Sequence, residues 1–125
     1  IQKGDYVSSS NNNFTLIGHN ASGTLYVYNR LNGTINQNVS GITLNTGEWF
    51  HLVVTNDSSN RNTIYYNGVK QTTSSFAPAN SSSNEWQIGG GDLGGFWDGG
   101  IDQVRIFDRA LDGDEVFKLY AEVLN

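Results

Sequence analysis

The feature that most constrains the fold of this chain is the period of its apolar residues, which recur mainly at every second position. They stand in short runs that are separated by clusters of Gly, Asn and Ser. Because successive side chains of a strand point to opposite faces, this period indicates β-strands with one face toward a core. Short strands joined by such turns predict an antiparallel all-β domain.

Three stretches carry the clearest strand signals. Phe14–Ile17 and Thr24–Tyr28 are predicted to form a hairpin across the turn HNASG. Trp49–Thr55 is the strongest predicted strand, and because both of its faces are largely apolar it is expected to be central in a sheet. Next follows TIYYNGVKQTT, where Asn67 and Gly68 stand between two β-rich runs and predict a type I′ hairpin turn.

The C-terminal half continues this pattern and then changes it. Residues 72–84 are expected to be a surface connection, and Trp86–Ile88 and Gly100–Phe107 are predicted strands with a glycine-rich loop between them. A helical spacing of apolar residues then begins, and Asp112 and Glu115 have the spacing of a capping box. The sequence therefore predicts one short C-terminal helix, whose apolar stripe is Val116, Leu119, Tyr120 and Val123.

The order of these motifs resembles the laminin G-like, pentraxin-related branch of the concanavalin A-like lectin and glucanase domains. The resemblance is carried by Trp49 and His51 in one strand, the Tyr65–Gly68 hairpin, the Ile88–Gly90 step, the strand Ile101–Ile106 and the helix start Ala110–Glu115. It implies a concanavalin A-like jelly roll, an antiparallel sandwich of two sheets with one short C-terminal helix. Residues 1–125 have the size of a single domain of this kind.

Domains of this family usually carry about forty further residues at their start, and the resemblance therefore implies that the N-terminal strands are missing. We expect the chain to be part of a longer polypeptide. An upstream segment or a neighbouring subunit is expected to complete the sandwich, because an open sheet edge invites association.

Composition excludes several classes of function. The chain has no Cys, which excludes disulfides and thiolate metal sites. Its net charge of −5 argues against a nucleic-acid partner, since such proteins concentrate Lys and Arg on one face. No apolar run approaches the roughly 18 residues of a membrane span, so no membrane insertion is expected.

Catalysis is not expected either. Glycoside hydrolysis needs an acid and a base or nucleophile on opposite sides of the scissile bond. Asp98 and Asp102 have a suitable spacing but lie on a glycine-rich approach to a strand, while the cluster Asp112–Glu115 is explained by helix capping. His51 is interpreted as a partly buried residue that is hydrogen-bonded across its sheet, and His19 as a solvated turn residue.

Calcium is the ion that the sequence could hold, since it accepts oxygen ligands from flexible loops. The resemblance implies such sites at the rim of some laminin G-like sandwiches. The candidate ligands are Asp92, Asp98 and Asp102. For each of them a structural role is the competing interpretation, and Asp102 could instead accept backbone amides or pair with Arg105.

A sugar-binding site needs an exposed aromatic face together with polar groups for the hydroxyls. Trp49, Trp86 and Trp97 fall at positions that resemble apolar family positions, so a core role is favoured for each. Phe96 is the best candidate for an exposed aromatic residue. The predicted ligand-binding residues lie in the loop 90–99 and are Asp92, Phe96, Trp97 and Asp98.

Two classes of function follow from these observations. The first is a non-catalytic recognition module, a glycan-binding or adhesion domain that contacts a glycan or surface polysaccharide. The second is a structural or interaction module of a phage or cell-surface appendage, such as a fibre, decoration or adhesin domain. Either class implies an extracellular, cell-surface or virion-surface location.

Overall fold

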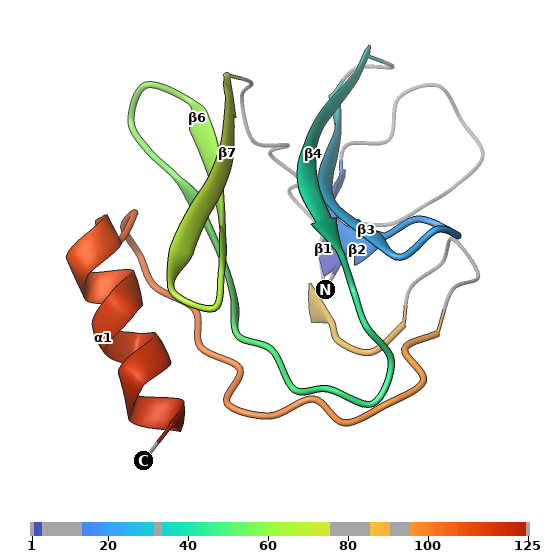
Figure 1. The fold of residues 1–125 in the computed structure, drawn as a ribbon. Helices are drawn as coiled ribbons and strands as arrows, with labels where there is room; N and C mark the ends of the chain where they lie inside the picture. Colours follow the sequence, from blue (N-terminus) through green and yellow to red (C-terminus); the bar gives the residue numbers. More distant parts are fainter. Residues whose placement is uncertain (1, 4–13, 32–33, 76–85, 91–95, 125) are drawn as a thin grey trace.

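The computed structural model describes residues 2–3, 14–31, 34–75, 86–90 and 96–124. Two antiparallel sheets face each other, and one helix lies on the outer side of the smaller sheet (Figure 1). The sheet orders are β4-β3-β2-β1-β8 and β5-β6-β7. The elements are β1 (Gln2–Lys3), β2 (Phe14–His19), β3 (Thr24–Leu31), β4 (Thr34–Thr43), β5 (Leu52–Asn56), β6 (Arg61–Tyr66), β7 (Val69–Ser75), β8 (Trp86–Gln87) and α1 (Gly113–Val123). The predicted two-sheet sandwich with a C-terminal helix is confirmed.

The predicted hairpin near the start of the chain is confirmed as β2 and β3. Asn20 shapes its turn, because the side-chain Oδ1 accepts hydrogen bonds from the amides of Ser22 and Thr24, both at 3.0 Å. Gly23 completes the turn with a φ of +77°, a conformation that costs little only for glycine.

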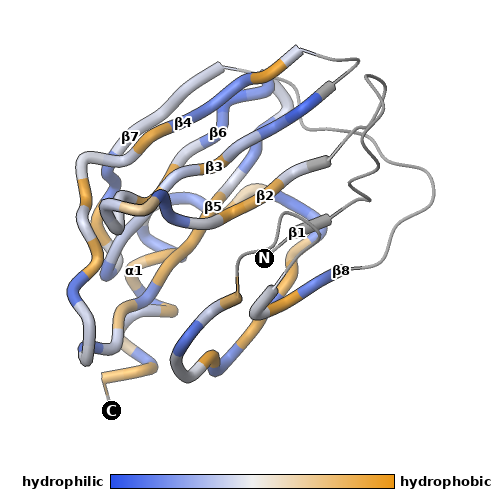
Figure 2. The backbone as a smooth tube through the Cα atoms, turned by 90° about the vertical axis from the view of Figure 1, so that its right-hand side faces the viewer, coloured by the Kyte–Doolittle hydropathy of each residue, from blue (hydrophilic) through white to orange (hydrophobic). Residues whose placement is uncertain are grey.

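Strand β4 was not predicted, because its buried face is polar. Asn38 and Ser40 are buried, whereas Ile35 and Val39 point outward. The Asn38 Nδ2 group donates across the interior to the backbone carbonyl of Asn62 at 2.9 Å and to its Oδ1 at 3.1 Å. These bonds offset the cost of burying an amide. In Figure 2 most of β4, β6 and β7 has the colours of hydrophilic or neutral residues.

The predicted type I′ turn joins β6 and β7. Asn67 and Gly68 have φ angles of 48° and 77°, so both have the positive values that this turn requires. Asn67 also binds the chain before β5: its amide donates to the His51 carbonyl, and its Oδ1 accepts from the His51 amide, both at 2.8 Å.

Two predictions about strands in this half were wrong. β5 begins at Leu52 rather than Trp49, and it is an edge strand of the three-stranded sheet rather than a central one. The expected surface connection also starts later, because β7 continues to Ser75; residues 76–84 lie outside the described part.

A larger correction concerns the predicted strand Gly100–Phe107. In the structure, residues 101–111 form no helix or strand, and residues 101–109 are exposed. Gln103 has a φ of 50°, a left-handed conformation that interrupts an extended chain. The strand pattern is present in the sequence, but within the described part of the chain no neighbouring strand pairs with it.

Helix α1 has the predicted capping box. Asp112 Oδ1 accepts from the Glu115 amide at 2.9 Å, and Glu115 Oε2 accepts from the Asp112 amide at 3.0 Å. The helix packs on the outer face of the three-stranded sheet through a cluster that joins Tyr65, Leu111 and Val116. A separate cluster between the sheets contains Val27 and Ile64.

Candidate functional site

The candidate loop is tied at its two described ends. Phe96 forms an antiparallel bridge with Gly90, and the amide of Trp97 donates to the carbonyl of Gly89 at 2.7 Å. Gly89 has a φ of 80°, which favours glycine at this position. The backbone therefore brings Phe96 and Trp97 back beside the end of β8, where the two side chains have different surroundings.

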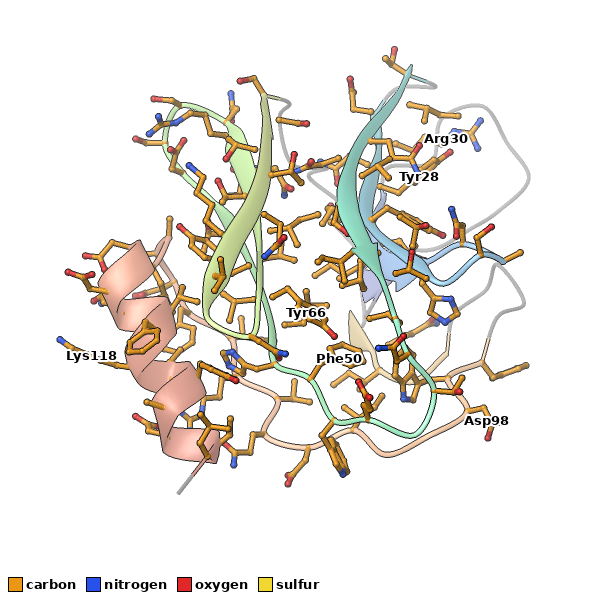
Figure 3. The ribbon with its side chains drawn as sticks, in the orientation of Figure 1. Tyr28, Arg30, Phe50, Tyr66, Asp98 and Lys118 are labelled. Atoms are coloured by element: carbon orange, nitrogen blue, oxygen red, sulfur yellow. The ribbon has the colours of Figure 1, made fainter. Side chains whose placement is uncertain are left out.

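Phe96 is 84% exposed, as expected for a candidate stacking residue. Trp97 is half-buried and contacts the rings of His19 and Phe50 edge-on, with centroid distances of 5.6 and 5.9 Å. Phe50 in turn stacks on Tyr66 at 5.6 Å. Figure 3 shows Phe50 and Tyr66 close together at one end of the sandwich. This aromatic row, His19–Trp97–Phe50–Tyr66, connects the two sheets and holds Trp97 at the described end of the loop.

Two details of the row were missed at the level of sequence. His19 is exposed as predicted, but its ring also supports Trp97 rather than being only solvated. The buried Nε1 of Trp97 has no hydrogen-bond partner among the described residues. A Cβ atom at Gly99 would lie 3.0 Å from this nitrogen, so glycine at 99 leaves room beside the indole.

Two of the three candidate calcium ligands, Asp98 and Asp102, lie in the described part of the chain. Asp98 is exposed and points away from the sandwich (Figure 3). Asp102 accepts from the next amide, that of Gln103, at 2.7 Å, and it does not pair with Arg105, which binds Glu122 instead. Asp92 lies outside the described residues. In the described ranges no group of three or more His, Asp or Glu residues is placed to hold a metal.

Trp49 was assigned to the core, and this prediction was wrong. Its side chain is 74% exposed and lies against Gly100, where an added Cβ would come within 2.6 Å of the ring. Trp49 therefore precedes β5 in the sequence, and its ring lies on the segment that follows the candidate loop. Of the other two tryptophans, Trp97 is half-buried, and the side chain of Trp86 is not among those that the structure describes.

His51 is half-buried, as predicted, but its cross-sheet hydrogen bonds are made by its backbone rather than its ring. The ring lies 5.9 Å from that of Tyr120 in α1, and its buried Nδ1 has no partner in the described part. Burial lowers the pKa of His51 below 6.5, and the positive charge of Arg105 lowers it further.

The acidic cluster at the helix start has the predicted structural role. Arg109 binds both carboxylate oxygens of Glu115, at 2.6 and 2.7 Å. This contact and the hydrogen bond from the Asp112 amide lower the pKa of Glu115 to about 2. Glu115 is therefore ionised at neutral pH and is unsuited to donate a proton as a general acid.

The fold and these motifs agree with what comparison with known proteins finds. Residues 2–117 match the laminin G family described as the concanavalin A-like lectin/glucanases superfamily. The chain belongs to this superfamily. None of the curated proteins compared with it matches.

One similar solved structure is the crystal structure of an S-layer domain-containing protein from Clostridium thermocellum ATCC 27405. The two are 25% identical, with a TM-score of 0.55. The match covers 94% of the present concanavalin A-like domain and 60% of that chain. No helix in the described ranges is both long and apolar enough to cross a membrane.

Proposed function

We propose that this concanavalin A-like domain is a non-catalytic recognition module that binds a glycan or surface polysaccharide through the loop ending at Phe96 and Trp97. The observation that carries the proposal is the contrast between these two rings. Phe96 is almost fully exposed, while Trp97 is fixed by His19 and Phe50. Because the neighbouring Trp97 is held in place by the fold, a sugar can stack on the Phe96 ring with little further loss of conformational entropy in the protein.

Polar groups for sugar hydroxyls are available beside this ring. Asp98 presents an exposed carboxylate, and Gly99 and Gly100 beside it are exposed too, whereas the Nε1 atom of Trp97 is buried. Asp92, Asp98 and Asp102 remain the proposed calcium ligands, with Asp92 the proposed fourth member of the sugar site.

The proposal of a non-catalytic role rests on how the acidic side chains are used. The cluster of Asp112, Asp114 and Glu115 begins a helix, and Glu115 is held ionised by Arg109. Asp102 is occupied by the neighbouring amide. Neither arrangement supplies the acid and base pair that glycoside hydrolysis needs.

The test is a glycan-array screen of the intact protein, with calcium and with a chelator, followed by titration of any glycan that binds. We expect Phe96→Ala to weaken binding at least about tenfold, roughly 1.4 kcal/mol, without a change in melting temperature. Phe117→Ala is the matched control, since Phe117 is also an exposed phenylalanine but lies on α1. Absence of binding in both conditions, or equal losses in both variants, would contradict the proposal.

The second candidate is a structural module of a cell-surface or virion-surface assembly, with the sandwich completed by an upstream segment or a neighbouring subunit. It is favoured by the solved structure of the S-layer domain-containing protein and by the exposed apolar residues that follow the loop. Both candidates place the protein outside the cell or on a surface. Stable assembly without glycan binding would favour the second.

A further inference from the structure

Two pairs of neighbouring aromatic residues each have one inner and one outer ring. The inner rings, Phe50 and Trp97, contact each other edge-on at a centroid distance of 5.9 Å. The outer rings are those of Trp49, which is 74% exposed, and Phe96, which is 84% exposed. The contact between the inner rings therefore holds side by side the two backbone segments that carry the exposed rings.

The ring of Trp49 lies on the backbone that follows Phe96 and Trp97. A Cβ atom at Gly100 would come within 2.6 Å of Cη2 and 3.0 Å of Cζ2 of this ring, so any side chain at position 100 would displace the indole. Gly100 follows Phe96 by four residues, and a backbone of that length spans at most about 14 Å. The two exposed rings are therefore close enough for one oligosaccharide to contact both.

Polar groups suited to sugar hydroxyls lie between the two rings. Asp98, Gly99 and Gly100 are exposed, and the side chain of Asp98 points away from the sandwich (Figure 3). A carboxylate accepts hydrogen bonds from hydroxyl groups, and a backbone without side chains lets a ligand approach closely. Exposed apolar faces with polar groups beside them mark a binding surface. Sugar rings match this surface, because they have apolar C–H faces and a rim of hydroxyl groups.

The charges around the two rings select among glycans. Exposed carboxylates stand next to both: Glu48 precedes Trp49 in the sequence, and Asp98 follows Trp97. Residues 98–115 carry six acidic and two basic side chains, a net charge of −4. The two basic residues are arginines that are each bound to a glutamate. Carboxylate or phosphate groups on a glycan would therefore meet charges of the same sign, which oppose binding.

We infer that Trp49 is a second stacking residue of the site at Phe96, and that the site takes an extended, uncharged glycan chain. One sugar stacks on each ring, and hydroxyls between them bind Asp98 and the backbone of Gly99 and Gly100. The inference rests on the proposed function, since it requires that the loop ending at Phe96 binds a glycan. It adds that the interior of a neutral chain is recognised, rather than a single terminal sugar or an acidic group.

The test is a glycan array printed with neutral and with acidic glycans, each as the monosaccharide and as oligosaccharides of increasing length. The intact protein is screened with calcium and with a chelator. We expect binding to neutral oligosaccharides, with little binding to the matching monosaccharides or to acidic chains. In titrations with the oligosaccharide that binds best, Trp49→Ala should weaken affinity at least about fivefold. Trp49→Phe keeps an aromatic ring and should weaken it less.

Two further variants separate the position of the ring from its presence. Gly100→Ala keeps the Trp49 ring but displaces it, and we expect it to weaken binding as Trp49→Ala does. Ile106→Ala is the matched control, because Ile106 is 61% exposed and follows the two rings in the same segment. It should bind like the unaltered protein. The melting temperature of the intact protein should be the same in all these variants.

The possible failures are distinguishable. If Phe96→Ala weakens binding and Trp49→Ala does not, or if the protein prefers monosaccharides or acidic glycans, the inference is wrong and the proposed function stands. A lower melting temperature of the intact Trp49→Ala protein would also overturn it, because the ring would then be covered by another part of the polypeptide. Absence of binding to every glycan would contradict the proposed function itself, and the inference with it.

Discussion

The β6–β7 hairpin with its helix and the segment 98–111 both carry strong local sequence signals, but only the first adopts the structure that those signals predict. In the hairpin region, Asn67 and Gly68 form the predicted turn and Asp112 caps the predicted helix. In the segment, strand-forming residues remain without strand pairing in the described structure. A turn or a cap is completed by residues close in sequence, whereas a strand needs a partner that the sequence of the strand does not specify.

The largest expected effect tests burial directly. Ile64→Ala should lower the free energy of unfolding by about 2–5 kcal/mol, because Ile64 is 1% exposed between the two sheets and its truncation leaves a cavity. Ile106→Ala, the same substitution at an exposed residue of the segment 98–111, should change the free energy of unfolding by no more than about 0.5 kcal/mol in the 125-residue chain. Urea unfolding of the two variants measures both changes in the free energy of unfolding. Similar losses in the two variants would mean that Ile106 is buried and that the contrast between the two regions is false.

The next effect tests the turn. Gly68→Ala should cost about 1–3 kcal/mol, because the φ of 77° disfavours a side chain and the new Cβ would lie 2.9 Å from Tyr120 Cδ1. Gly41→Ala is the control, since a Cβ there meets nothing within 4 Å. Thermal unfolding compares them. A tolerated Gly68→Ala would show that helix α1 does not pack on the turn.

A smaller effect is expected at the helix cap. Asp112→Ala removes the acceptor for the Glu115 amide and should cost about 0.5–2 kcal/mol. Asp112→Asn keeps an acceptor in the same place and should recover most of that loss. Chemical unfolding monitored by circular dichroism gives both values, and equal losses in the two variants would argue against a role for the cap.

The smallest effect is a pH dependence at His51. The pKa of His51 is lower in the folded state than its ordinary 6.5, so the unfolded chain binds the proton more readily. Stability from this residue is therefore fully present above pH 6.5 and is lost as pH falls through the folded-state pKa. We expect a modest decline in melting temperature below pH 6.5 that His51→Gln reduces. An unchanged decline in that variant would assign it to other groups.

These comparisons also explain what could be predicted from the sequence. The two-sheet fold, the Asn67-Gly68 turn, the capping box and the exposure of Phe96 follow from local patterns and from the family resemblance. β4 escaped prediction because its interior contacts are made by Asn38 and Ser40, which resemble surface residues until Asn62 is placed opposite.

The misplaced aromatic residue has a related cause. Trp49 was assigned to the core because it falls at a position that resembles an apolar family position, but β5 begins only at Leu52 and the ring lies outside, on Gly100. The surroundings of Trp49 depend on where the segment 98–111 lies, and the strand pattern of that segment does not predict this. The predicted ligand and calcium residues of the loop remain predictions.

Residue-resolved amide hydrogen exchange of the 125-residue chain tests the central contrast most directly. We predict slow exchange in β6, which pairs with a strand on each side, and in the interior of α1, with fast exchange from Ile101 to Phe107. Slow exchange across Ile101–Phe107 in the monomeric 125-residue chain would contradict it, because that segment would then already be a paired strand.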